Sequence, residues 1–219
     1  MNNNALLLTA HLHVGFISND PWSPAIDGIL AAMHMQNVLG DQYFINQGHS
    51  YQMEPVDDLP LEKTHWNDLW WYNCSCPVYT PIRQQTAHLH RRFNAKQAED
   101  FADESTKTVL TKAGVYKNAR LTYQQKIVKQ VYWHVIGEKS KIESLLSRCH
   151  HVGARRGSGF GRVKKWTVET EGADENMAKY YRPLPAGAVD NHERVQMEWG
   201  IRPPARIPQN VFMCAMPIS

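Results

Sequence analysis

The stretch Gly153-Ala-Arg-Arg-Gly-Ser-Gly-Phe-Gly-Arg-Val163 decides the fold because of the elements that flank it. Residues 138–150 precede it with apolar side chains at helical spacing, which predicts an amphipathic helix. Residues 125–136 come before that helix and are β-prone, so they predict a strand that ends at Gly137. Residues 162–169 follow the glycines and predict a further strand, with a shift of register near its end. The apolar stripe of the predicted helix consists of Ile142, Leu145, Leu146 and Cys149.

The N-terminal part also pairs a strand with a helix. Residues 5–14 end in strict alternation, which predicts a strand with His11 and His13 on one face. A helix capped by Ser23 is expected to follow and to end at Gly40. Two strand-helix units with strands between them predict an α+β fold with a ferredoxin-like, RRM-like βαββαβ sheet. One face of that sheet would carry no helix.

The other segments are predicted as additions to a domain of residues 1–170. Residues 41–68 are acidic and rich in proline, which predicts a long surface insertion. Residues 70–79 have the aromatic and apolar content of an edge strand. Residues 82–122 are polar and basic, so we expect a protruding element or a partly disordered loop. Residues 171–219 hold several prolines without a clear period, which predicts an irregular C-terminal extension packed on the core.

Composition narrows the class of protein. The 219 residues include 24 Lys+Arg against 21 Asp+Glu, and 42% are apolar, as in ordinary globular proteins. No apolar run reaches the length of about 18 residues that spans a bilayer, and the polar start lacks the features of a signal peptide. We therefore expect a cytoplasmic protein with no membrane partner. Four scattered cysteines do not form a disulfide framework, so reduced thiols are expected.

The charges are unevenly placed along the chain. Residues 69–98, 105–137 and 144–168 contain several lysines and arginines but no acid. Such separation creates a positive potential on part of the surface even when the net charge is only +3. Phosphate groups, and nucleic acid in particular, are the expected partner.

The glycine-rich stretch has the residues of a phosphodiester site. Its four glycines let the backbone approach a ligand and form an anion nest, and its arginines supply charge and paired donors. It lacks the Gly-Lys-Ser/Thr of a Walker loop, and the helix precedes it, unlike in a dinucleotide-binding fingerprint. The candidate RNA-binding residues here are Gly153, Arg155, Arg156, Gly157, Ser158, Gly159, Phe160, Gly161, Arg162 and Lys164.

On these residues the chain resembles the RAMP superfamily of CRISPR systems, RNA-binding proteins with a ferredoxin-like fold. The glycine-rich stretch is similar to the family's loop between its second helix and last strand, and Tyr132-Trp-His-Val-Ile-Gly137 is similar to the strand before that helix. Phe16 to Met35 is similar to the first helix of the subunit that caps the 5′ end of crRNA, particularly in type IV complexes. The resemblance implies a non-catalytic subunit, without a cofactor or metal, that binds the 5′ handle of crRNA. Its other partners would be the backbone and large subunits, with target DNA contacted at most indirectly.

The resemblance also implies a basic thumb that separates handle from guide, and residues 82–122 match it by position and charge. Phe93 and Tyr116 are candidates for stacking on splayed bases. The further RNA-binding candidates are His11 and His13 on the sheet, and Arg83, Arg91, Arg92, Lys107, Lys112, Lys117 and Arg120 in the thumb.

Two alternatives remain at this point, and a third can be set aside. The histidine pairs His11/His13, His88/His90 and His150/His151 would suit a metal-independent endonuclease that cleaves repeat RNA. The glycine-rich loop could instead bind a nucleotide or another phosphorylated metabolite. A zinc site built from Cys74, Cys76, Cys149 and His150 has the wrong spacing, and buried thiols are the expected state of these cysteines.

Overall fold

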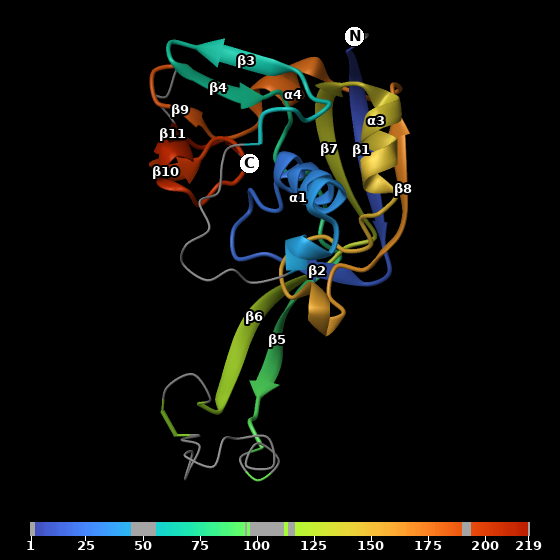
Figure 1. Ribbon diagram of the computed structural model, residues 1–219, viewed down its shortest axis with the longest axis vertical. Helices are drawn as coiled ribbons and strands as arrows, with labels where there is room; N and C mark the ends of the chain where they lie inside the picture. The colour runs from blue at the N-terminus through green and yellow to red at the C-terminus, as the bar shows by residue number, and fades with distance from the viewer. Residues whose placement is uncertain are drawn as a thin grey trace.

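The computed structural model describes residues 3–44, 56–94, 96, 112–113, 117–189 and 194–218 (Figure 1). Its centre is an antiparallel sheet with the strand order β7-β1-β8, formed by Gln130–Gly137, Asn4–Leu12 and Val163–Glu169. Helices α1 (Ile26–Leu39) and α3 (Lys139–Leu146) pack on one face of this sheet and share its core. Strands and helices thus make an α+β fold.

All four residues of the predicted stripe are at most 8% exposed: Ile142, Leu145 and Leu146 lie in α3, and Cys149 lies in the turn after the helix, which ends at Leu146. The end of α1 at Gly40 was also predicted, and its φ of 53° favours glycine. The predicted start of α1 was wrong. The helix begins at Ile26 after Ala25, because the indole Nε1 of Trp133 donates to the carbonyl of Pro24 at 3.0 Å and holds the preceding turn outside the helix.

Residues 73–78 extend the central sheet beyond β7. The amide of Ser75 donates to the carbonyl of His134 at 2.8 Å, and Val78 and Tyr132 exchange two backbone hydrogen bonds of 2.9 Å. These antiparallel contacts are too irregular to form a named strand, although they lie inside the predicted edge strand 70–79. The order across the sheet is therefore residues 73–78, β7, β1 and β8.

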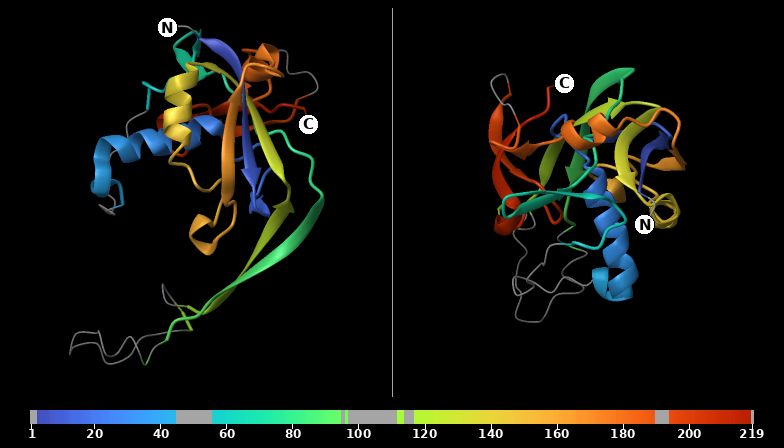
Figure 2. Two further views of the ribbon diagram at one scale, coloured as in Figure 1. Left: turned by 90° about the vertical axis from the view of Figure 1, so that its right-hand side faces the viewer. Right: turned by 90° about the horizontal axis from the view of Figure 1, so that it is seen from above.

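A second sheet has the order β2-β6-β5, formed by Gly15–Ile17, Ala119–Ile127 and Arg83–Arg91. Beyond the short β2, strands β5 and β6 form a two-stranded ribbon that projects away from the body (Figures 1 and 2). The single strand predicted over 125–136 was wrong, because Ile127 pairs with Gly15 in this sheet whereas Gln130 pairs with His11 in the central one. The chain therefore changes sheets at residues 128–129.

The predicted surface insertion 41–68 was wrong for the residues that the structure describes. A 3₁₀ turn, η1 (Gly40–Phe44), opens it, and near its end β3 (Lys63–Trp66) forms a hairpin with β4 (Leu69–Tyr72), which follows it. Between them Val56, Leu59 and Leu61 are buried. The hydroxyl of Tyr72 donates to the carbonyl of Val56 at 2.9 Å and accepts from the amide of Leu59, which anchors this segment in the core. Residues 45–55 lie outside the described ranges.

The predicted irregular extension 171–219 contains regular structure. It forms helix α4 (Glu175–Tyr180) and a sheet of order β10-β11-β9, with η4 (Pro208–Asn210) before β11. The three strands are Gln196–Gly200, Val211–Ala215 and Leu184–Pro185. Leu184, Ile201, Cys214 and Met216 bury a second core with Trp71. Figure 1 and the right-hand view of Figure 2 place this sheet on the opposite side of α1 from α3.

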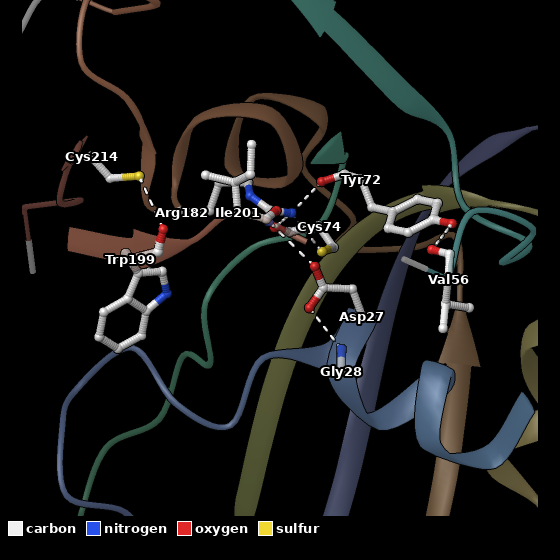
Figure 3. Close-up of polar contacts among 9 residues, drawn as sticks. All are labelled: Asp27, Gly28, Val56, Tyr72, Cys74, Arg182, Trp199, Ile201 and Cys214. Atoms are coloured by element: carbon white, nitrogen blue, oxygen red, sulfur yellow. Dashed lines mark hydrogen bonds and ion pairs between the residues drawn. The ribbon is translucent and has the colours of Figure 1, made fainter. Parts of the chain in front are cut away.

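A buried arginine joins the two cores (Figure 3). Arg182 follows α4, and its Nη2 contacts the Oδ2 of Asp27 in α1 at 3.3 Å and donates to the carbonyl of Ile201 at 2.6 Å. Its Nη1 donates to the carbonyl of Tyr72 and to the Sγ of Cys74. Asp27 and Arg182 are at most 5% exposed, so this ion pair is shielded from water and links α1, the end of β4 and the C-terminal sheet.

Candidate nucleic-acid interface

The glycine-rich loop runs from the end of α3 to β8 and is fixed at its base by backbone hydrogen bonds. The amide of Ala154 donates to the carbonyl of Ile17 at 2.9 Å, and the amide of Gly161 donates to the carbonyl of Gly15 at 2.9 Å. The loop is therefore bonded directly to β2 and, through β2, to the ribbon strand β6. Its tip forms the 3₁₀ turn η3 (Arg156–Ser158).

The four glycines of the loop fall into two classes. A Cβ at Gly153 or Gly161 would lie 2.7 Å from the carbonyl oxygen of Ile17 or 1.8 Å from that of Val152, so these two glycines permit close packing of the backbone. A Cβ at Gly157 or Gly159 would meet nothing within 4 Å. The loop is thus closely packed at its base and open at its tip, where a ligand can reach the backbone.

We expect Gly161→Ala to lower the free energy of unfolding by about 2 kcal/mol or more, because the φ of 71° and the contact with Val152 both exclude a side chain. Gly157→Ala is the matched control and should stay within about 0.5 kcal/mol of the wild type. Urea unfolding monitored by tryptophan fluorescence measures both values. Equal losses in the two variants would contradict this division of the loop.

The arginines of the loop are exposed, and one of them connects the loop to the ribbon. The guanidinium of Arg155 lies 4.7 Å from the ring centroid of Tyr123 in β6. Arg156 and Arg162 are exposed in the same loop, and Lys164 is exposed at the start of β8. The structure therefore brings the predicted loop residues together with the root of the ribbon in one basic surface.

The ribbon has two chemically different faces. Across it, Ala87 pairs with Tyr123 and Leu89 with Leu121, which makes one face largely apolar. The other face is polar, with the pairs Thr86 and Gln124, His88 and Thr122, and His90 and Arg120. Tyr123, Leu121 and Gln125 were not among the predicted site residues. The period-two spacing of Leu121, Tyr123 and Gln125 could have indicated that they share one face of a strand. Residues 119–125 contain few apolar side chains, so this pattern was too weak to be recognised.

The predicted thumb residues are spread along the ribbon rather than gathered at the loop. Arg83 lies at its root opposite Ile127, whereas Arg91 lies at the far end and donates to the carbonyl of Lys117. Arg92, Lys112, Lys117 and Arg120 are exposed. The backbone of Phe93 is bonded to the side chain of Asn118. Lys107 and Tyr116 lie outside the described residues.

The two histidines predicted on one face of a strand are separated by the end of that strand. His11 lies in β1, where its Nδ1 is 3.2 Å from the side-chain Nε2 of Gln130. Burial and the neighbouring charge of Lys165 lower the pKa of His11. His13 follows the last residue of β1 and is exposed beside the glycine-rich loop, where its amide donates to the carbonyl of Arg162 at 3.0 Å. The prediction of a shared face was therefore wrong, because the strand ends at Leu12.

A cavity of about 190 Å³ lies where the β1–β2 turn, β6 and the loop meet. Its lining includes His13, Gln125, Ser158, Phe160 and Arg162. A wider groove of about 720 Å³ lies between α3 and β8. The small cavity therefore belongs to the surface formed by the loop and the root of the ribbon, and the wide groove lies beside it.

The cysteines occupy separate environments. All four are buried free thiols, and burial raises the pKa of Cys74 to about 12. Cys74 contacts Arg182, whereas the thiol of Cys149 donates to the carbonyl of His151 at 3.4 Å. Within the described ranges no group of three or more His, Cys, Asp or Glu side chains could hold a metal ion.

A comparison with protein families gives this surface its context. The family model described as CRISPR type IV associated protein Csf3 matches residues 4–211. The chain belongs to the Csf3 family. The match spans the central sheet, the ribbon, the glycine-rich loop and most of the C-terminal region. No curated protein matches the chain.

Membership of the Csf3 family makes the protein a type IV CRISPR-associated protein and supports a role as a subunit of a type IV CRISPR complex. The predicted resemblance to this group of proteins is thereby confirmed. None of the helices in the described part of this Csf3-family chain is long and apolar enough to cross a membrane.

Proposed function

We propose that the protein is the crRNA-binding subunit that caps the 5′ handle in a type IV CRISPR complex and contacts the first backbone subunit. The observation that carries this proposal is the junction of the glycine-rich loop with the root of the ribbon, made by the stacking of Arg155 on Tyr123. Exposed arginines, an open backbone and a ring suit a single strand, which offers phosphates and unstacked bases together. Large subunits and, indirectly, target DNA are the further partners of such a complex.

The sheet order supports a ferredoxin-like RAMP fold for this subunit. In a βαββαβ sheet the last strand and the third strand flank the first, and the second strand lies outside the third. Strand β8, β1 and β7 follow this order, and residues 73–78 take the place of the second strand with irregular pairing. The sheet face away from α1 and α3 carries Thr9 and His11, and α4 packs near one end of β7.

RNA is favoured over a small phosphorylated metabolite by the distribution of charge. The exposed lysine and arginine side chains run from the loop to the far end of the ribbon instead of converging on one enclosed cavity. A chain of phosphates can contact all of them, whereas a single metabolite can contact only a few. The ribbon is the thumb in this proposal.

Replacing residues 88–122 by Asn-Gly tests the ribbon. Ala87 and Tyr123 pair directly, so a two-residue turn can join them while Gln125 and Lys126 stay in place against β2. We expect a melting temperature close to that of the wild type, together with loss of assembly onto crRNA and the backbone subunit, measured by size-exclusion chromatography. A variant with Arg91, Arg92 and Arg120 replaced by Gln keeps the ribbon and isolates the effect of its charge. Normal assembly of the shortened protein would contradict the role of the ribbon.

We propose further that the subunit binds RNA without cleaving it. Among the described residues, the histidine that contacts a carboxylate is His34, at 3.2 Å from Asp58, and it lies on α1 away from the loop. His11 faces Gln130, and His88 faces Thr122 at 3.3 Å, so neither has a carboxylate to hold it as a general base.

A labelled repeat RNA incubated with the protein in EDTA should therefore remain intact on a denaturing gel. The control reaction omits the protein. Cleavage at one position that disappears when His11, His13, His88 or His90 is replaced would favour the endonuclease alternative instead.

A further inference from the structure

We infer that the cavity beside the glycine-rich loop is a nucleobase pocket, in which the side-chain amide of Gln125 donates hydrogen bonds to acceptor atoms on the edge of a single splayed base. This inference rests on the proposed function and adds a base-reading subsite to it. The cavity has a volume of about 190 Å³, and it opens beside the exposed Arg162. Phosphate binding by the loop would place a nucleotide at its entrance.

The walls of the pocket are fixed before any ligand arrives. The amide of Gly161 bonds to Gly15, and the amide of His13 bonds to Arg162. A Cβ at Gly15 would lie 2.1 Å from the carbonyl oxygen of Lys126, so the β1–β2 turn lies directly against β6. Because three separate segments are joined by their backbones, a base entering the pocket would not have to order them.

Gln125 is the polar residue that would orient a base in the pocket. It is only 7% exposed, yet it lines the cavity. Its Oε1 accepts a hydrogen bond of 2.9 Å from the Nε2 of Gln85, which fixes the orientation of the amide. No residue in the described ranges accepts from the Nε2 of Gln125. The group left for a ligand is therefore a pair of N–H donors.

The remaining lining suits an aromatic ring. Phe160 supplies an apolar, half-buried side chain, and Ser158 and His13 lie at the exposed rim. A planar base fits such a site because its face can stack on the ring of Phe160 while its edge accepts hydrogen bonds from the side-chain amide of Gln125. A phosphate does not fit the interior as well, because only the exposed Arg162 of the loop's three arginines belongs to the lining, and Phe160 beside it is apolar.

The test measures the affinity of the full chain for single-stranded RNA oligonucleotides of one length, with U, C, A, G or an abasic residue at every position. The wild type should bind the bases unequally and the abasic strand more weakly. Gln125→Leu should abolish the preference and weaken binding to the preferred base by about tenfold, since a donor pair is lost. Gln125→Glu should turn the preference toward bases that offer an amino group, because a carboxylate accepts.

Two further variants separate the pocket from its surroundings. Gln124→Leu changes the neighbouring exposed glutamine on the other face of β6 and should leave the preference unchanged. Gln85 is exposed, so Gln85→Leu should not unfold the protein. The substitution removes the hydrogen bond that orients the side-chain amide of Gln125. It should therefore weaken the preference among bases while the overall affinity for RNA is kept.

The outcomes that overturn the inference are distinct from failure of the proposed function. Equal binding of all strands, abasic RNA included, would overturn the base pocket and leave RNA binding intact. An unchanged base preference in both Gln125 variants would do the same. Failure of the wild type to bind any RNA would overturn the proposed function, and the pocket with it.

Discussion

Replacing Arg155, Arg156 and Arg162 together by alanine is expected to weaken binding of a repeat RNA by about a hundredfold at physiological salt. All three side chains are exposed, so their removal should not disturb the core. The loss arises because each arginine can pair with a phosphate and release a counterion. The slope of log K against log salt should therefore become shallower by about 2, at roughly 0.7 for each contact with a single strand.

The control for this variant removes the same number of positive charges elsewhere. Lys139, Lys141 and Lys179 lie on α3 and α4, and each contacts a glutamate of its own helix or, for Lys141, the glutamate just before the helix. Their replacement by alanine should change the affinity and the salt slope little. Filter binding over a series of salt concentrations measures both quantities. An affinity of the loop variant that equals the wild type at about 150 mM salt would exclude the loop from the interface.

Arg182→Ala is expected to cause the largest loss of stability of any single change considered, about 3–5 kcal/mol. The substitution leaves the buried carboxylate of Asp27 without its cation and removes the donor to the carbonyl of Ile201. Burial makes both effects large, because water cannot replace the missing partner.

Two comparisons make the measurement specific. Arg206→Ala removes an exposed arginine and should stay within about 0.5 kcal/mol of the wild type. Replacing both partners, with Asp27→Leu and Arg182→Met, should be less damaging than Arg182→Ala, because no uncompensated charge stays buried. Urea unfolding gives all four free energies. A loss below about 1 kcal/mol in Arg182→Ala would show that the pair is not needed to join the two cores.

Local patterns predicted those elements whose apolar residues have a clear period. The stripe of α3 is strong and ends in a glycine-rich turn, so helix, loop and β8 could all be recognised. The strand break at residues 128–129 could not, because both flanking segments are β-prone and only the pairing of Ile127 and Gln130 with different partners separates them. In the C-terminal region, Pro185 lies in a short strand and Pro208 just before another. Prolines disfavour the prediction of strands, so the sheet there, which long-range contacts stabilise, could not be predicted from the local sequence.

The candidate site was predictable in part for the same reason. Glycines and arginines close together in sequence identified the loop. Gln125 and Tyr123 join it only through the pairing of β2 with β6 and through the contact of Tyr123 with Arg155. No spacing in the chain indicates that a residue of the ribbon lines a cavity with His13, since more than 100 positions separate them.

The ribbon also sets a length scale on the surface. Strands β5 and β6 have nine residues each, which at about 3.3 Å per residue makes an arm of roughly 30 Å. Arg83 at one end and Arg91 at the other are therefore too far apart to contact the same nucleotide or to interact electrostatically at physiological salt. A strand of RNA bound along this arm contacts its two ends at different nucleotides. The contributions of the two ends to the binding affinity therefore add independently.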